Sequence, residues 1–210
     1  MFTSMRKNGL ILAMFALGCT ALVVVTNELT KEKISHQQQQ EKLQTLAALL
    51  PLGSYDNDLV ASCKQVTSRT YLGSDQPQAL YTATKAGVVT GYALETVAPD
   101  GYSGAIRLIV GMDQRGTVHA VRVLAHKETP GLGDKLELKK SNWINSFVGK
   151  FLSADNAASW AVKKDGGEFD AFTGATITPR AVVKAVKNVL VMQQTHPELL
   201  SSAPACPAAN

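Results

Sequence analysis

The stretch Asp170-Ala171-Phe172-Thr173-Gly174-Ala175-Thr176-Ile177-Thr178-Pro179 is the most informative part of this chain. It is rich in small and hydroxylated residues, and it leads directly into a helical pattern. Thr178 is a favourable N-cap, and Pro179 is of the type preferred at the first position of a helix. Apolar residues then recur at helical spacing, at Val182, Val183, Val186, Val189 and Leu190. The sequence therefore predicts a helix over 179–195, which Pro197 ends.

The loop in front of this helix predicts an anion site. Gly174 allows positive φ or a close approach of the backbone to another group. The first amides of a helix have no acceptor within the helix, and the macrodipole adds partial positive charge there. A phosphate group is a favourable ligand at such a position. The hydroxyl of Thr176 would lie beside that site. An ordinary turn with a helix cap is equally compatible with these residues taken alone.

A resemblance to a known family supports the phosphate interpretation. Asp170 and the tract from Thr173 to Thr176 resemble the recognition sequence of proteins that carry FMN covalently, through a phosphoester bond to the last threonine. In chain order with this tract, three further segments resemble the G subunit of the Rnf (Rsx) electron-transport complex. These segments are Ala98–Gly104, Glu128–Lys135 and Lys163–Gly167. The resemblance extends from the N-terminal segment to about residue 195.

The resemblance assigns roles to the residues of the tract. It implies that Thr176 is the FMN attachment site and that its neighbours provide amides and hydroxyls to the phosphate. Those neighbours are Thr173, Gly174, Ala175 and Thr178. Asp170 belongs to the sequence that the modifying enzyme reads, an extracytoplasmic flavin transferase that uses FAD and magnesium. A turn or capping acid is the alternative role for Asp170.

A second wall of the flavin site is expected from the segment 128–133. Pro130 would fix a turn together with Gly131 and Gly133. Leu132 would then offer an apolar face to the isoalloxazine ring. Glu128 and Thr129 would hydrogen-bond the ring edges. A purely structural loop is the alternative. Lys163 would approach the phosphate or, alternatively, only flank a turn.

The function implied is that of an electron carrier. The chain shows no nucleophile–base pair, no paired catalytic carboxylates and no nucleotide-binding glycine loop after a strand. The resemblance implies a redox subunit, without substrate turnover of its own, in a complex that couples electron transfer between ferredoxin and NAD to Na⁺ or H⁺ transport. The alternatives are the C subunit of the sodium-pumping NADH:quinone reductase and a flavin-free, membrane-anchored assembly or sensor module.

Composition and residue spacing also bear on nucleic-acid binding, metal binding and disulfide formation. The net charge is +4, and the sequence has no block of like charges and no basic–aromatic interleaving, so a nucleic-acid partner is not expected. Three cysteines and four histidines lack any metal-ligand spacing, so no metal site is expected. Cys63 and Cys206 would both lie in an extracytoplasmic compartment, which permits a disulfide between them. Two free thiols are the alternative.

The segment 9–26, GLILAMFALGCTALVVVT, carries no charge. Its length of about 27 Å as a helix is enough to cross the bilayer core, where lipid surrounds it. Arg6 and Lys7 precede it, so the positive-inside rule predicts a single-pass inner-membrane protein with a cytoplasmic N-terminus and a periplasmic domain. A cleaved signal peptide is the main alternative, and a lipoprotein site at Cys19 is a weaker one.

The chain is thus expected to contain five regions. They are a cytoplasmic N-terminus (1–8), the transmembrane helix (9–26), a helical stalk (27–50), a periplasmic FMN-binding domain (51–200) and a Pro/Ala-rich tail (201–210). We expect an α+β domain: an antiparallel meander with helices packed on one side. Its expected strands are residues 81–85, 88–97, 105–112 and 117–125, with 105–125 as the central hairpin and 54–78 rich in loops. Helices are expected at 142–148, 154–161 and 179–195.

Overall fold

The computed structural model describes residues 2–51 and 53–207 and has two compact units, Met1–Gln44 and Thr45–Asn210. The first residue of the predicted N-terminal region and the last three of the predicted tail lie outside the described residues. The first unit consists of helix α1, Phe2–Ala47, which continues into the first residues of the second unit.

Helix α1 contains one segment, Arg6–Lys31, that is long and apolar enough to cross a membrane. Its mean hydropathy is 2.4, and none of its most apolar window is buried against protein. The predicted span 9–26 lies inside this segment. The helix ends at Ala47, slightly before the predicted end of the stalk at residue 50. The side chains of Ile34 and of the glutamine run 37–40, predicted to lie on the stalk, are outside the described residues.

The second unit is built on a five-stranded antiparallel sheet in the order β1-β2-β3-β4-β5. This confirms the predicted α+β meander. The strands are β1 Lys64–Ser68, β2 Ser74–Lys85, β3 Val88–Ala98, β4 Ile106–Asp113 and β5 Val118–Ala125. The expectation of loops over 54–78 was wrong, because that stretch contains β1, the short helix α2 (Arg69–Leu72) and the start of β2. The β4–β5 hairpin is also not central, because β5 is an edge strand.

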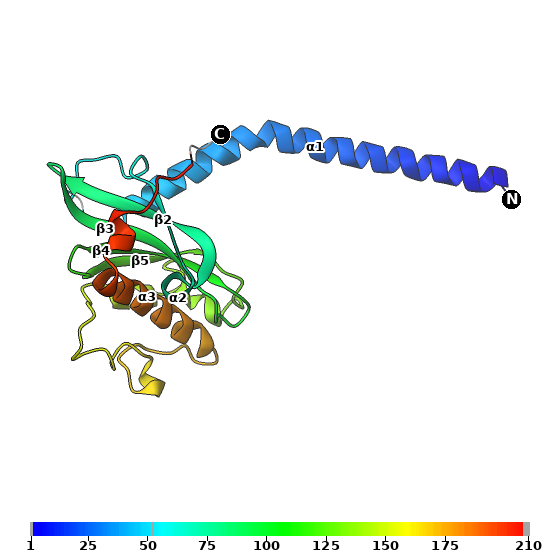
Figure 1. The fold of residues 1–210 in the computed structure, drawn as a ribbon. Helices are drawn as coiled ribbons and strands as arrows, with labels where there is room; N and C mark the ends of the chain where they lie inside the picture. Colours follow the sequence, from blue (N-terminus) through cyan, green and yellow to red (C-terminus); the bar gives the residue numbers. More distant parts are fainter. Residues whose placement is uncertain (1, 52, 208–210) are drawn as a thin grey trace. The chain divides into compact units, whose positions relative to one another are not determined.

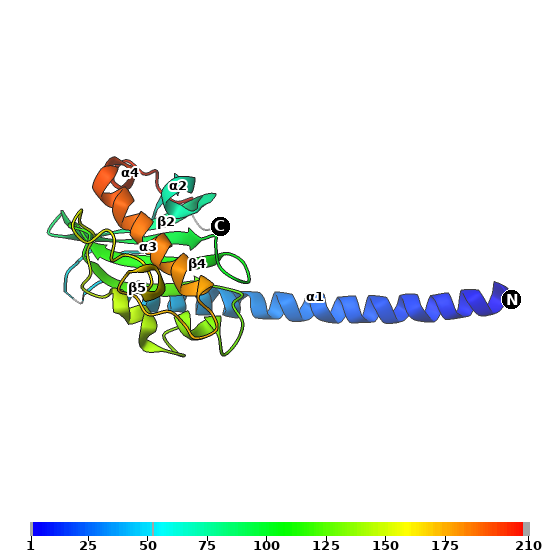
Figure 2. The ribbon, with the colours of Figure 1, turned by 90° about the horizontal axis from the view of Figure 1, so that it is seen from below.

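The sheet is covered on both faces, whereas the sequence predicted helices on one side only. Helix α3, Ile177–Thr195, lies across one face, and α4, Glu198–Ser201, follows its end (Figures 1 and 2). Even-numbered residues of β4, such as Leu108 and Val110, join the main core with the apolar stripe of α3. Ile109, on the opposite face, packs in a second cluster with Leu46 and Leu49.

A glycine in β4 permits this second layer. A Cβ built on Gly111 would lie 2.2 Å from the carbonyl oxygen of Leu49, a distance that no side chain tolerates. The chain that follows α1 can therefore cross the sheet in direct contact with its backbone. This packing of a segment that is distant in sequence closes the second face of the sheet, and strand periodicity alone does not reveal it.

Three short 3₁₀ helices lie between β5 and α3. They are η1 Gly133–Leu136, η2 Asn142–Phe147 and η3 Lys163–Asp165. The helix predicted over 142–148 is therefore a 3₁₀ helix, and the helix predicted over 154–161 was wrong, because that stretch forms turns. Asn156 explains the difference, since its side chain accepts from the amide of Ser153 at 2.8 Å and donates to the carbonyl of Phe151 at 2.9 Å. Such bonds compete with a helix for the backbone.

The C-terminal segment covers one edge of the sheet. Cys63 and Cys206 form a disulfide with a Cα–Cα distance of 5.4 Å. Beside it, the amide of Gln65 donates to the carbonyl of Pro204 at 2.8 Å, and the amide of Cys206 donates to the carbonyl of Cys63 at 3.0 Å. The tail therefore acts as a short additional strand that protects the edge at β1.

Candidate functional site

A hollow of about 360 Å³ brings together three segments that are distant in sequence. The first contributes Tyr102, from the turn between β3 and β4. The second contributes Glu128, Thr129, Leu132 and Gly133, from the loop after β5. The third contributes Gly174, Ala175, Thr176 and Ile177, at the start of α3. A volume in the range of about 300–1,000 Å³ is typical of small-molecule sites.

Helix α3 has a different threonine at its N-cap from the one that the sequence predicted. The helix begins at Ile177, so Thr176 occupies the N-cap position, with helical backbone angles and no side-chain cap bond. Thr178 is instead fully buried, and its hydroxyl donates to the carboxylate of Glu128. The prediction that Thr178 is the N-cap was therefore wrong. Pro179 is the third helical residue, still within the first turn, where its missing N–H costs no helical bond.

The three threonines of the tract have distinct environments. Thr176 is half-buried and lines the hollow, and its hydroxyl has no hydrogen-bond partner among the described residues. Thr178 is buried, and its hydroxyl is used in the bond to Glu128. Thr173 is exposed and lies outside the residues that line the hollow. Thr176 is thus the threonine of the tract that lines the hollow and has a hydroxyl without a hydrogen-bond partner among the described residues.

Glu128 joins the three segments of the hollow. Its side chain is only 5% exposed. One carboxylate oxygen accepts from the amide of Ser103 at 3.0 Å, and the other accepts from the hydroxyl of Thr178. The backbone amide of Glu128 donates to Nδ1 of His126 at 3.0 Å. The carboxylate predicted to reach the ring edges is therefore engaged within the protein, where it holds the walls of the hollow in place.

The glycine at position 133 is required by this buried acid. A Cβ on Gly133 would lie 2.7 Å from Oε2 of Glu128 and 3.0 Å from Oγ1 of Thr178. The turn that contains it is closed by the amides of Leu132 and Gly133, which both donate to the carbonyl of Thr129. Gly131 adopts a φ of +78° in this turn but does not line the hollow.

Leu132 places an apolar side chain at the hollow, and its contact with the flavin ring stays a prediction. It is 43% exposed and lines the hollow. A Cβ on Gly174 would lie 3.5 Å from its Cδ2 atom, so the leucine lies directly beside the tract. Ile177, 44% exposed, lines the same space and was not predicted as a site residue. Its signal in the sequence was an apolar residue at the start of a helix whose buried stripe does not include it.

The predicted charged residues form an exposed pair beside the tract. Nζ of Lys163 lies 2.6 Å from Oδ1 of Asp170, and neither residue lines the hollow. The carbonyl of Asp170 accepts from the indole N–H of Trp143 at 2.8 Å. Phe172 is buried with its ring 5.0 Å from that of Trp143. The start of the tract is therefore held by aromatic packing, while its carboxylate remains accessible at the surface.

An ion pair between η3 and α3 lies nearby. The carboxylate of Asp165 accepts two hydrogen bonds from the guanidinium of Arg180, both at 2.6 Å. These bonds lower the pKa of Asp165 and raise the pKa of Arg180. Both groups stay ionised at neutral pH, and the pair fixes the loop that precedes the tract against the first turns of the helix.

The residues present fit a flavin mononucleotide. The hollow combines apolar side chains, which suit a planar ring, with a helix start, which suits a phosphate. Thr176, whose hydroxyl has no hydrogen-bond partner among the described residues, lines the hollow at the start of this helix. Among the described residues, no three histidine, cysteine or acidic side chains are grouped in a way that could hold a metal ion.

Comparisons with known proteins found two matching family models and several similar chains. A family model described as the FMN-binding domain matches residues 101–191, and one described as the RnfG N-terminal region matches residues 1–49. The chain is 54% identical to the G subunit of the ion-translocating oxidoreductase complex of Shewanella baltica over 186 residues, which is 89% of this chain and 88% of the relative. It is 49% identical to that of Aliivibrio fischeri and 51% identical to that of Vibrio cholerae, each over 204 residues and 97% of both chains.

A solved structure is also similar in part. The NqrC of Shewanella oneidensis aligns with a TM-score of 0.49 at 22% identity, covering 70% of this chain and 75% of that one.

Proposed function

This chain belongs to the RnfG family, the G subunits of ion-translocating oxidoreductase (Rnf) complexes, and contains an FMN-binding domain, and from that premise we propose that Thr176 carries FMN through a phosphoester bond. Family membership favours the Rnf subunit over the C subunit of the sodium-pumping reductase. The proposal makes the chain a covalent flavoprotein that passes electrons within the complex.

One observation carries the proposal. Of the three hydroxyls in the tract, that of Thr176 alone combines a place in the hollow with the lack of a hydrogen-bond partner among the described residues. It also lies at the start of the 19-residue helix α3. The unpaired amides there favour a phosphate, and the missing cap bond means that esterification of the hydroxyl breaks no contact.

Different residues of the chain would hold the phosphate and the ring of the flavin. The backbone from Gly174 to Ile177 would surround the phosphate, and Leu132 with Ile177 would contact the ring. Glu128 would keep these walls at a fixed separation through its two hydrogen bonds. When bound, FMN supplies reversible electron uptake and release, which none of the protein side chains offers.

Attachment requires a partner enzyme. In the proposed reaction, the hydroxyl of Thr176 loses its proton and forms a bond to the FMN phosphorus of FAD, while the bond to AMP breaks and AMP leaves. The flavin transferase would read the tract together with Asp170, whose carboxylate is accessible at the surface. Within the complex, the electrons carried by this subunit would serve transfer between ferredoxin and NAD, coupled to movement of Na⁺ or H⁺.

The site is proposed to lie on the periplasmic side of the inner membrane. Arg6 and Lys7 come before the apolar part of α1, which predicts a cytoplasmic N-terminus and lipid around the helix. The disulfide between Cys63 and Cys206 is consistent with an oxidising compartment for the domain. The regions 1–8, 9–26, 27–50, 51–200 and 201–210 keep their predicted roles in this proposal.

A denaturing gel tests the proposal. The full chain is expressed with the flavin transferase, separated on the gel and illuminated with ultraviolet light. We expect a fluorescent band from the parent and from Thr176→Ser, which keeps a hydroxyl, and a dark band from Thr176→Ala. Mass spectrometry of the peptide 165–180 should find FMN less one water on the parent. A dark parent band contradicts the proposal and favours the flavin-free module. An adduct that persists in Thr176→Ala also contradicts the proposal, because the flavin is then attached to another residue.

A further inference from the structure

The two edges of the sheet are treated differently by the fold. The edge at β1 is paired with the C-terminal segment and fixed by the disulfide. The edge at β5 is paired only at its first residue, where Val118 exchanges backbone hydrogen bonds with Gly149 and Lys150 at 2.8 Å. Within residues 2–51 and 53–207, the outer edge of the rest of β5 makes no further backbone–backbone bond. Such an edge is a template for another strand.

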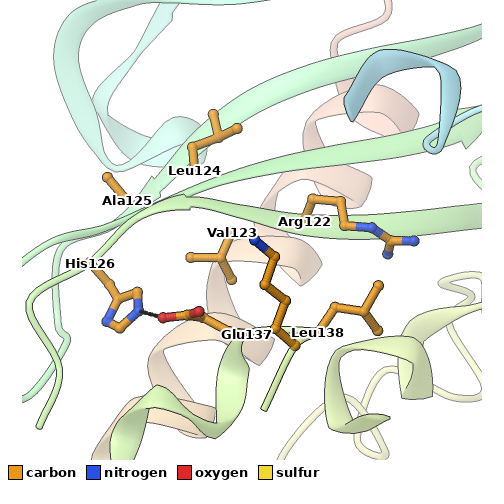
Figure 3. Close-up of a pocket in the computed structure, with 8 residues that line it drawn as sticks. Arg122, Val123, Leu124, Ala125, His126, Glu137 and Leu138 are labelled. Atoms are coloured by element: carbon orange, nitrogen blue, oxygen red, sulfur yellow. Dashed lines mark hydrogen bonds and ion pairs between the residues drawn. The ribbon is translucent and has the colours of Figure 1, made fainter. Parts of the chain in front are cut away.

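A groove runs along this unpaired part of β5. It has a volume of about 550 Å³ and lies between residues 122–126 on one side and residues 137–139 on the other. Figure 3 shows Val123 pointing from β5 toward the segment that carries Glu137 and Leu138. At one end, Nε2 of His126 lies 2.7 Å from Oε1 of Glu137, so this pair joins the two walls (Figure 3).

The groove has apolar side chains and two cations, Arg122 and Lys139, that contact no carboxylate among the described residues. Leu124 is 38% exposed and Leu138 is 42% exposed. The guanidinium of Arg122 donates to the carbonyl of Val121 at 2.8 Å and to Oδ1 of Asn145 at 3.5 Å, and it meets no carboxylate among the described residues. Lys139 makes no hydrogen bond or ion pair with any described residue. The one acid of the groove, Glu137, is already engaged by a histidine.

We propose that the groove along β5, residues 122–126 with 137–139, binds an extended acidic segment of a neighbouring subunit of the complex. The segment adds a strand to the free edge of β5, and its apolar side chains contact Leu124 and Leu138. Its carboxylates lie against Arg122 and Lys139. Affinity in this mode comes from main-chain hydrogen bonds, and side-chain pockets provide the specificity.

The combination of features selects this occupant. A lipid headgroup or a free anion would neutralise the two cations but would leave the backbone of β5 unpaired and the leucines exposed. A second copy of this chain offers its own β5 edge, which would place like charges opposite one another. Burial lowers the pKa of the Arg122 guanidinium, so a carboxylate from the bound segment would also offset part of the cost of burying this cation.

Hydrogen exchange tests the added strand. The purified complex and the purified full-length subunit are compared in the same detergent, with exchange followed in the peptide that contains residues 119–126. We expect exchange in the complex to be slower by roughly tenfold or more, because the outer amides gain partners. The peptide that contains β1 serves as the control, since its edge is already paired, and its exchange should not change. Equal exchange of the β5 peptide in both samples overturns the proposal.

Cross-linking identifies the occupant. A photo-reactive amino acid at Leu138 in the assembled complex should form an adduct with an Asp/Glu-rich peptide of another subunit, whereas the same group at Val88, 65% exposed in the β2–β3 hairpin, should not. Lys139→Glu should lower the yield per assembled complex by roughly tenfold, because like charges then meet in the groove. Arg115→Glu, an equal charge change on the exposed β4–β5 turn, should not.

The cross-linking outcomes decide between the occupants. An adduct with phospholipid or with a second copy of this chain overturns the proposal, as does a yield that Lys139→Glu leaves unchanged. The Thr176→Ala complex should give the same adduct as the parent. This inference therefore rests on membership in the complex and is independent of flavin attachment.

Discussion

Replacing Glu128 should destabilise the domain and disorganise the flavin site together. The carboxylate is 5% exposed and accepts from the amide of Ser103 and from the hydroxyl of Thr178. In Glu128→Ala, both donors lose their acceptor. A hydrogen bond to a charged group contributes roughly 1.5–3 kcal/mol. Ser103 is exposed, so water replaces that acceptor in part, and removal of a desolvated charge returns some free energy.

These terms lead to an expected loss of about 3 kcal/mol in the free energy of unfolding for Glu128→Ala. In a domain of this size, 1 kcal/mol corresponds to a shift in Tm of roughly 2–4 °C, so we expect a decrease of about 6–12 °C. Glu128→Gln keeps an oxygen for Ser103 and places an amide beside the hydroxyl of Thr178. It should cost about 1 kcal/mol or less. Glutamine keeps the volume and the polar atoms of the side chain, so the two variants together separate loss of the negative charge from loss of the whole side chain.

Thermal unfolding of the full chain, followed by circular dichroism in detergent, measures both shifts. Glu168→Ala is the matched control, because Glu168 is 40% exposed and pairs with Lys150 at 2.9 Å. An exposed ion pair contributes at most about 1 kcal/mol. The same samples report in-gel flavin fluorescence per protein, which should fall in Glu128→Ala. A Tm for Glu128→Ala within the range of the Glu168→Ala control refutes the reasoning.

Three further predictions follow from other contacts. Reduction of the disulfide, or Cys63→Ala with Cys206→Ala, should lower the stability by about 3–5 kcal/mol because the bridge spans 143 residues, and denaturant unfolding with and without reductant measures this. Burial raises the pKa of Asp113, but amide hydrogen bonds outweigh it and the net pKa is lowered, so its contribution to stability is present at neutral pH and disappears as the pH falls below about 4. Asp113→Ala should flatten that part of the pH–stability curve, and an unchanged curve would exclude this group as the cause. Leu132→Asp should keep the attached FMN but change its midpoint potential, and an identical redox titration would remove this leucine from the ring contact.

The sequence predicted the middle of the sheet closely. The strands expected at 88–97 and 105–112 occur as Val88–Ala98 and Ile106–Asp113. Both are rich in β-branched residues and are joined by a short turn, so local composition determines them. Helix α3 was found for the same reason, since its apolar stripe follows the helical period.

Other elements depend on contacts that are distant in sequence. Strand β1, KQVTS, is polar and short, and it is held by β2 and by the C-terminal tail rather than by its own pattern. The second layer on the sheet depends on Gly111, whose missing side chain admits the backbone at Leu49. Neither the tail nor the segment after α1 has a periodic pattern that indicates where it packs on the sheet. These features therefore could not be predicted from the local sequence.

The candidate site also combines features that follow from local sequence with one that depends on a contact distant in sequence. Within the tract, local cap preferences favoured Thr178 as the N-cap, and the resemblance favoured Thr176 for the flavin. The structure explains how both hydroxyls can lie in one turn with different roles: Glu128, fifty residues away, takes the hydroxyl of Thr178. Because that acid also binds Ser103, the hydroxyl left available beside the hollow is that of Thr176. Which of the two hydroxyls remains available is therefore a tertiary property, because it depends on a buried carboxylate that no local rule would connect to the helix, and the proposed attachment to Thr176 rests on it.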